Sequence, residues 1–207
     1  MGPQIAQGER RSGEPSVARH GSFDFAGETL WGGRPQAEDL TPKTGHRGPE
    51  AATLMTIVGV ISDTHGLLRP EAIEALRGAA RILHAGDIGA PEILKALVKI
   101  APVTAVRGNV DRESWARSIP LNDVIEVEEV SIYVLHILEE LDLKPHASGF
   151  GAVVYGHSHV PKAETRKGVL YFNPGSAGPR RFALPVTVGR LVIEGGVVRG
   201  EIIELAG

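Results

Sequence analysis

Three short apolar runs, separated by two segments with helical spacing, constrain the fold of this chain most strongly. The runs span residues 57–61, 82–84 and 103–106, and short apolar runs of this kind are typical of strands that are buried on both faces. The segments between them, residues 70–81 and 91–100, each begin with proline, which favours the first turn of a helix. The order predicts a β-α-β-α-β unit with parallel strands.

Polar side chains follow each of these runs. Asp63 and His65 come after the first run, Asp87 after the second and Asn109 after the third. The ligand site of an open α/β sheet lies beyond the carboxyl ends of its strands, so we expect function in these loops. Residues i and i+2 of an extended chain lie on one face, so Asp63 and His65 can point the same way.

The second half of the chain is predicted to be rich in strands, with little helix. Seven segments have the apolar or alternating pattern of strands: 124–127, 130–136, 152–155, 163–165, 169–172, 186–193 and 197–205. Lys167-Gly168 and Gly195-Gly196 favour tight hairpin turns. We therefore expect the C-terminal third to be antiparallel and to form a second sheet against the first. The predicted fold class is α/β, a four-layer αββα sandwich of two mixed sheets.

Histidines add to the candidate ligands in this half. His136 ends one predicted strand, and His157 and His159 repeat the spacing of two. Seven side chains at strand ends could therefore bind metal: Asp63, His65, Asp87, Asn109, His136, His157 and His159. This number suits two ions, with Asp87 as the carboxylate that bridges them. Oxygen and imidazole ligands suit Mn, Fe, Zn, Co or Ni, and the absence of cysteine excludes thiolate sites and cysteine nucleophiles.

The candidate ligands fall in a series of motifs, in this order along the chain: Asp63-Thr64-His65, Gly86-Asp87, Gly108-Asn109, His136 and Gly156-His157-Ser158-His159. The series resembles the calcineurin-like metallophosphoesterase superfamily, and it is most similar to the small bacterial and archaeal phosphodiesterase subfamily. The turn Asn173-Pro174-Gly175-Ser176 is also typical of that subfamily, and the resemblance runs from Met55 to the end of the chain. The resemblance implies one metal ion held by Asp63, His65, Asp87 and His159, and a second held by Asp87, Asn109, His136 and His157.

Two positions depart from the pattern of the wider superfamily. Val110 stands where many members have a histidine that protonates the leaving group, which leaves Asp111 as the candidate acid. Ile137 stands where a glycine often follows the ligand histidine. The small phosphodiesterase subfamily shares the Asn-x-Asp pattern, so the first departure narrows the family resemblance.

We therefore predict a phosphoric diester hydrolase with two divalent metal ions, manganese first among the candidates. The ions would lower the pKa of a bridging water, and the resulting hydroxide would attack phosphorus in line with the leaving oxygen. The predicted catalytic residues are Asp87, Asn109 and Asp111, and the predicted substrate-binding residues are Asn109 and Arg181. Because the usual acid is absent, aryl diesters, whose leaving groups are stable anions, should be turned over fastest. The alternative is a non-catalytic protein-binding scaffold of the same fold, like the retromer subunit that resembles this subfamily.

The first 54 residues differ in composition from the rest. They contain 9 glycines and 5 prolines but only 15 hydrophobic residues, which is the composition of a disordered tail. The metallophosphoesterase domain is therefore expected over residues 55–207, and Met55 could be the true start of translation. The tail has neither the apolar run of a secretory signal nor the acid-poor composition of a transit peptide, so we expect a cytoplasmic protein.

Charge and hydropathy narrow the expected partners. The formal net charge of -3 gives no basic field of the kind that holds a nucleic-acid backbone, so a small phosphodiester is the expected substrate. No stretch after residue 54 approaches the roughly 18 consecutive apolar residues of a membrane span, so no membrane partner is expected. A sheet edge or an apolar helix face could support a homo-oligomer.

Overall fold

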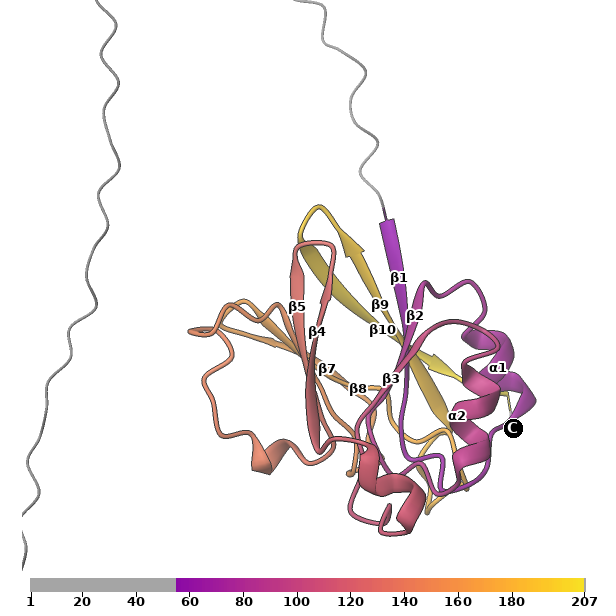
Figure 1. Cartoon of the computed structure of the whole chain (residues 1–207). Coiled ribbons are helices and arrows are strands. Elements are labelled where there is room, and N and C mark those ends of the chain that lie inside the picture. Colours follow the sequence, from indigo (N-terminus) through magenta and orange to yellow (C-terminus); the bar gives the residue numbers. More distant parts are fainter. Residues whose placement is uncertain (1–54, 207) are drawn as a thin grey trace, which may run out of the picture. The chain divides into compact units, whose positions relative to one another are not determined.

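The computed structural model describes residues 55–206, which form two five-stranded sheets (Figure 1). The tail predicted for residues 1–54 lies outside the described residues. The first sheet has the order β10-β9-β1-β2-β3, with β1 (Met55–Ile61), β2 (Arg81–His84), β3 (Val103–Ala105), β9 (Thr187–Glu194) and β10 (Val197–Glu204). The second sheet has the order β4-β5-β6-β8-β7, with β4 (Asn122–Val127), β5 (Val130–Leu135), β6 (Ala152–Val154), β7 (Lys162–Arg166) and β8 (Val169–Asn173).

The predicted β-α-β-α-β unit is present and supplies three strands of the first sheet. β1 pairs with β2 and β2 with β3, both in parallel, and the crossovers contain α1 (Pro70–Ala75) and α2 (Pro91–Leu97). Both helices end before the predicted residues 81 and 100. The first ends early because Gly78 adopts a left-handed backbone with φ of 80°, and the chain then turns into β2.

The C-terminal hairpin belongs to the first sheet, so its predicted place in a second sheet was wrong. β9 pairs antiparallel with β1 along most of its length, and β10 pairs with β9. Both predicted tight turns are present, since Lys167-Gly168 joins β7 to β8 and Gly195-Gly196 joins β9 to β10. The antiparallel prediction for this part of the chain holds for the two hairpins and for the pairing of β9 with β1, whereas β6 and β8 pair in parallel.

The two sheets pack face to face and bury the main hydrophobic core between them. This core takes side chains from strands of both sheets, including Val60, Leu83, Ile132, Phe172 and Leu191. The helices cover the other face of the first sheet (Figure 1). Within residues 55–206, the outer face of the second sheet is covered by the 3₁₀ turn η2 (Leu138–Glu140) and the loop after it instead of an α-helix. The sandwich prediction is therefore confirmed, with a thin fourth layer.

Phe172 is the largest fully buried side chain, and its ring fills the space between the sheets. Its ring atoms would lie 2.5 Å from a Cβ placed on Gly189 or on Gly200, so these glycines of β9 and β10 leave room for it. We expect Phe172→Ala to reduce the free energy of unfolding by about 3–5 kcal/mol, because the cavity cannot be refilled from two rigid sheets. Urea denaturation measures this value.

Phe182 offers a matched control, since its side chain is 93% exposed. Phe182→Ala should change the free energy of unfolding by no more than about 0.5 kcal/mol. A loss below about 1 kcal/mol for Phe172→Ala would contradict the inter-sheet role of this ring.

Candidate metal centre

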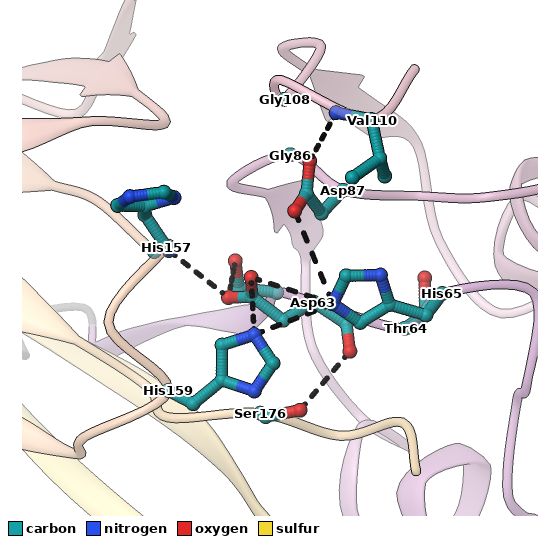
Figure 2. Close-up of polar contacts among 12 residues, drawn as sticks. Asp63, Thr64, His65, Gly86, Asp87, Gly108, Val110, His157, His159 and Ser176 are labelled. Atoms are coloured by element: carbon teal, nitrogen blue, oxygen red, sulfur yellow. Dashed lines mark hydrogen bonds and ion pairs between the residues drawn. The ribbon is translucent and has the colours of Figure 1, made fainter. Parts of the chain in front are cut away.

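The loops after β1 and β2 are joined by backbone hydrogen bonds, and this brings the first candidate ligands together. The N–H of Asp63 donates to the Gly86 carbonyl over 3.0 Å, and the N–H of His65 donates to the Asp87 carbonyl over 2.9 Å. The two strands are adjacent and parallel, so their carboxyl ends meet at the same edge. Figure 2 shows Asp63 at the centre of the site, with His65, His157 and His159 around it.

Five of the seven predicted ligands have a left-handed backbone, which is rare for residues other than glycine. The φ angles are 54° at Asp63, 46° at His65, 52° at Asp87, 67° at His157 and 58° at His159. Each such residue costs on the order of 1 kcal/mol or more, and such residues cluster at functional sites. Five backbone positions of unfavourable conformation thus lie at one edge of the fold, as is common at functional sites.

The first group of facing ligand atoms comes from Asp63, His65 and His159, all within 4.8 Å of one another. His159 Nε2 lies 3.2 Å from Asp63 Oδ1 and 3.3 Å from His65 Nε2. Asp63 Oδ2 accepts hydrogen bonds from the Ser62 hydroxyl and the His157 N–H, whereas the buried Asp63 Oδ1 accepts none. A buried carboxylate oxygen without a donor is costly, and a cation at this position would satisfy it. The group therefore fits a divalent metal ion.

A second group contains Asp63 again, with Asp87 and His136. His136 Nδ1 lies 2.7 Å from the Ala85 carbonyl oxygen, which can only accept, so Nδ1 carries the proton. When the ring is neutral, His136 Nε2 presents its lone pair to the site, 3.3 Å from Asp87 Oδ1 and 3.2 Å from Asn109 Oδ1. When the ring is protonated, the same nitrogen donates to Asp87. A backbone carbonyl that fixes the imidazole tautomer is the usual second partner of a metal-binding histidine.

The remaining predicted ligands are close to these groups. Asn109 contacts His136, and the His157 ring lies 5.2 Å from the His136 ring, centre to centre. The structure thus brings all seven predicted ligands to one edge of the fold. Asp63 belongs to both groups of facing atoms, although the sequence singled out Asp87 as the bridge.

The pKa values of His65 and Asp87 shift toward the protonation states that metal binding requires, whereas burial alone would lower the pKa of His136 but Asp87 raises it overall. Burial lowers the pKa of His65 below its ordinary value, against the pull of Asp87 and Asp63. Burial alone would raise the pKa of Asp87, but hydrogen bonds from His136 and the Val110 N–H lower it overall. A neutral imidazole and an ionised carboxylate are both ready to bind a cation.

His84 lies beneath the site as a buried, neutral support. The Thr64 hydroxyl donates to the Ile88 carbonyl over 2.8 Å, so its oxygen is left to accept from His84 Nε2 at 2.9 Å. The Gly86 N–H donates to His84 Nδ1 over 3.3 Å. Both ring nitrogens are therefore used with a single proton, and burial lowers the pKa of His84 to about 4.

This neutral histidine should make the metal-free protein less stable in mild acid. Between pH 6.5 and about 4 the unfolded chain takes up a proton at His84 that the folded protein cannot take up. Stability is therefore fully present above pH 6.5 and is lost as the pH falls toward 4, by up to about 3 kcal/mol. Urea denaturation of wild type and His84→Gln in EDTA, from pH 4.5 to 7, should show a shallower pH dependence for the variant. Equal slopes would contradict the neutral, buried role.

Asp111, the predicted acid, lies among backbone N–H groups of two loops. Its carboxylate accepts three backbone hydrogen bonds, from the N–H groups of Ile88 over 3.1 Å, Gly89 over 2.9 Å and Gly108 over 2.8 Å. Both carboxylate oxygens are therefore engaged by backbone N–H groups, and Asp111 forms a clamp between the loops after β2 and β3.

The Asn173-to-Ser176 turn and Arg181 complete the surroundings of the site. Asn173 Nδ2 donates to the Gly156 carbonyl over 2.8 Å, and the Ser176 hydroxyl donates to the Asp63 carbonyl over 3.1 Å. The turn thus supports both ligand-bearing loops. Arg181 Nη2 lies 3.4 Å from His65 Nε2, at the exposed side of the site.

Sequence reasoning assigned no role to two small residues on which this geometry depends. The Ser62 hydroxyl donates to Asp63 Oδ2 over 2.7 Å. A Cβ on Gly108 would lie 2.0 Å from Asp87 Oδ1, so only glycine lets the two loops approach. The glycine that precedes the ligand in Gly108-Asn109, as in Gly156-His157, was the available signal.

Comparison with known proteins identifies the class to which this arrangement belongs. A family model described as the calcineurin-like phosphoesterase superfamily domain matches residues 55–196. The chain belongs to this superfamily, and the resemblance read from its motifs is confirmed.

Individual relatives agree with this assignment. A probable metallophosphoesterase of Methanothermobacter thermautotrophicus is 34% identical over 160 residues, which cover 72% of this chain and 92% of that protein. A solved archaeal phosphodiesterase has a TM-score of 0.60 at 24% identity and covers 72% of this chain and all of its own. Vps29 from Entamoeba histolytica, solved with Zn²⁺, has a TM-score of 0.57 at 20% identity and covers 72% of this chain and 99% of its own. Among residues 55–206, no helix is long and apolar enough to cross a membrane.

Proposed function

We propose that this protein hydrolyses small phosphodiesters with two divalent metal ions, of which manganese is the first candidate. The observation that carries the proposal is the buried, unpartnered Asp63 Oδ1, which faces His159 Nε2 at 3.2 Å within a group of three ligand side chains. When bound, the ions would supply a hydroxide nucleophile near neutral pH and would offset the charge of the phosphate.

The protein's own side chains would orient the substrate and hold its charge. Asp63, His65 and His159 form one ligand group, and Asp87 and His136 lie in the other. The Asn109 side chain, fixed against His136, can donate its amide N–H to a phosphoryl oxygen that gathers charge in the transition state. Arg181 can bind a second oxygen from the exposed side.

Leaving-group chemistry follows from the engagement of Asp111. Both of its oxygens are occupied by backbone N–H groups, and Val110 has no proton to give. The leaving oxygen must then depart as an anion or take its proton from water. Hydrolysis should therefore slow steeply as the pKa of the leaving alcohol rises.

The test is hydrolysis of bis(p-nitrophenyl) phosphate by the metal-stripped chain, before and after Mn²⁺ is restored. We expect activity only with metal, and a melting temperature that rises with Mn²⁺ concentration because the ion binds the folded state. A series of symmetric diaryl phosphates with phenols of differing acidity would then give the dependence on leaving-group pKa. Equal rates with and without metal would refute the proposal.

A protein-binding scaffold of the same fold is the second candidate, and the fold similarity to Vps29 favours it. The five left-handed ligand positions count against it, because a scaffold gains nothing from maintaining their strain. A folded protein that binds Mn²⁺ but leaves every diester intact would decide for the scaffold.

A further inference from the structure

Exposed apolar side chains gather next to the candidate ligands in sequence. Ten large hydrophobic residues are exposed among residues 55–206, and four of them belong to loops of the site. Val110 and Val160 directly follow Asn109 and His159, Leu67 lies two residues after His65, and Phe182 follows Arg181. Leu121 lies farther along the sequence but lines a small cavity with Asn109 and His136, and the other five have no such placement. We call Leu67, Val110, Val160 and Phe182 the apolar rim.

The loop that carries Phe182 is fixed to the site at its start. The Ala177 N–H donates to the Ser62 carbonyl over 3.1 Å, and a Cβ on Gly178 would lie 2.6 Å from the Asp63 carbonyl oxygen. A bridge between Ser176 and Val186 brings the two ends of the loop together. The residues between them therefore form a short loop with closely spaced ends, at the edge of the candidate metal centre.

Phe182 has an unfavourable backbone conformation, and its side chain is exposed to solvent. Its φ is 53°, a left-handed value that is a genuine outlier for a bulky side chain, and it is 93% exposed. The exposed ring makes no buried contact that would offset this strain. The neighbouring Arg181 lies 3.4 Å from His65. The Leu184 N–H donates to the Arg181 carbonyl over 3.2 Å, so a closed turn presents the Phe182 ring to solvent next to the residue that contacts His65.

We infer that Phe182, with the rest of the apolar rim, binds an aromatic substituent of the phosphoester substrate. The inference rests on the proposed function and specifies its substrate class: a diester with at least one aromatic group, as opposed to a purely aliphatic or sugar-phosphate diester. The phosphoryl group would lie among the ligands and Arg181, and the aromatic group would lie against the Phe182 ring. Ring stacking combined with apolar burial favours such a ligand by about five- to thirtyfold in affinity.

The experiment compares two ligands with the same head group. Phenylphosphonate and methylphosphonate are not hydrolysed, so calorimetric titration of the Mn²⁺-loaded full chain reports binding independently of turnover. We expect wild type to bind phenylphosphonate about five- to thirtyfold more tightly, and this ratio to fall to about two or less in Phe182→Ala. Val98→Ala is the matched control, because Val98 is 56% exposed but lies beyond the end of α2, and it should keep the wild-type ratio.

Either of two results would overturn the inference. One is a wild-type ratio near one, and the other is an unchanged ratio in Phe182→Ala. Phe182 is exposed, so the variant should fold, and its melting temperature checks this. If neither phosphonate binds the metal-loaded wild type, the proposed phosphodiesterase itself fails and the inference falls with it, which distinguishes that failure from loss of aromatic preference alone.

Discussion

Asp87→Asn should lower the rate of bis(p-nitrophenyl) phosphate hydrolysis by about a thousandfold or more at saturating Mn²⁺. The carboxylate is 3% exposed, and its Oδ1 and Oδ2 lie 3.3 Å from His136 Nε2 and 3.9 Å from His65 Nε2. Asparagine keeps the size of the side chain but removes its charge and one of its two ligand oxygens. Loss of charge stabilisation at a two-metal centre costs several kcal/mol, which is about a thousandfold in rate.

The same variant should separate catalysis from folding. Without metal, Asp87→Asn should unfold at a slightly lower temperature than wild type, because the fold holds the pKa of Asp87 below its ordinary value and so favours the charged carboxylate. With Mn²⁺, it should lose most of the wild-type rise in melting temperature. The exposed Asp142 supplies the control Asp142→Asn, which should match wild type in every assay. Wild-type activity in Asp87→Asn would exclude Asp87 from the centre.

Gly108→Ala should have the next largest effect, and it should act through Asp87. The added methyl carbon would lie 2.0 Å from Asp87 Oδ1 and 2.3 Å from the Asp87 backbone nitrogen. The loops after β2 and β3 would have to separate, which also breaks the hydrogen bond from the Gly108 N–H to Asp111. We expect a loss of about 1–3 kcal/mol in the free energy of unfolding and of about a hundredfold in Mn²⁺-dependent hydrolysis.

Gly78→Ala is the control for this substitution. A Cβ on Gly78 meets no atom within 4 Å, although its φ of 80° strains any other residue. This variant should lose about 1 kcal/mol of stability and no activity. Equal activity of the two alanine variants would mean that the approach of Gly108 to Asp87 does not matter for the site. Urea denaturation and the diester assay measure both effects.

Local pattern was sufficient for most elements of the fold. Short apolar runs and alternation predicted the strands to within two residues at their ends, because burial on one or both faces leaves a direct record in the sequence. The turns at Lys167-Gly168 and Gly195-Gly196 were predictable, since few residues tolerate the left-handed backbone that such turns need. The first helix was predicted too long because Gly78 was not read as a signal for its end, and the second ends at Leu97, before the predicted residue 100.

The sequence did not predict which sheet each strand belongs to. β9 is apolar on both faces, which says that it is covered on both sides but not by which partner. Its pairing with β1 depends on contacts between residues more than a hundred positions apart. Strand pairing is a property of the whole packed chain, so the C-terminal hairpin was assigned to the wrong sheet.

For the candidate site, too, the sequence predicted one part and the tertiary structure decided the rest. The sequence by itself determined the chemical types, since Asp, Asn and His at successive strand ends indicate a set of candidate metal ligands. Only the tertiary structure decided which atoms face one another: Asp63 Oδ1 is left without a donor, and both oxygens of Asp111 are taken by backbone N–H groups. The residue types show which ligand and acid groups are present. Hydrogen bonds between loops that are distant in sequence decide which of these groups remain free to bind metal or transfer a proton.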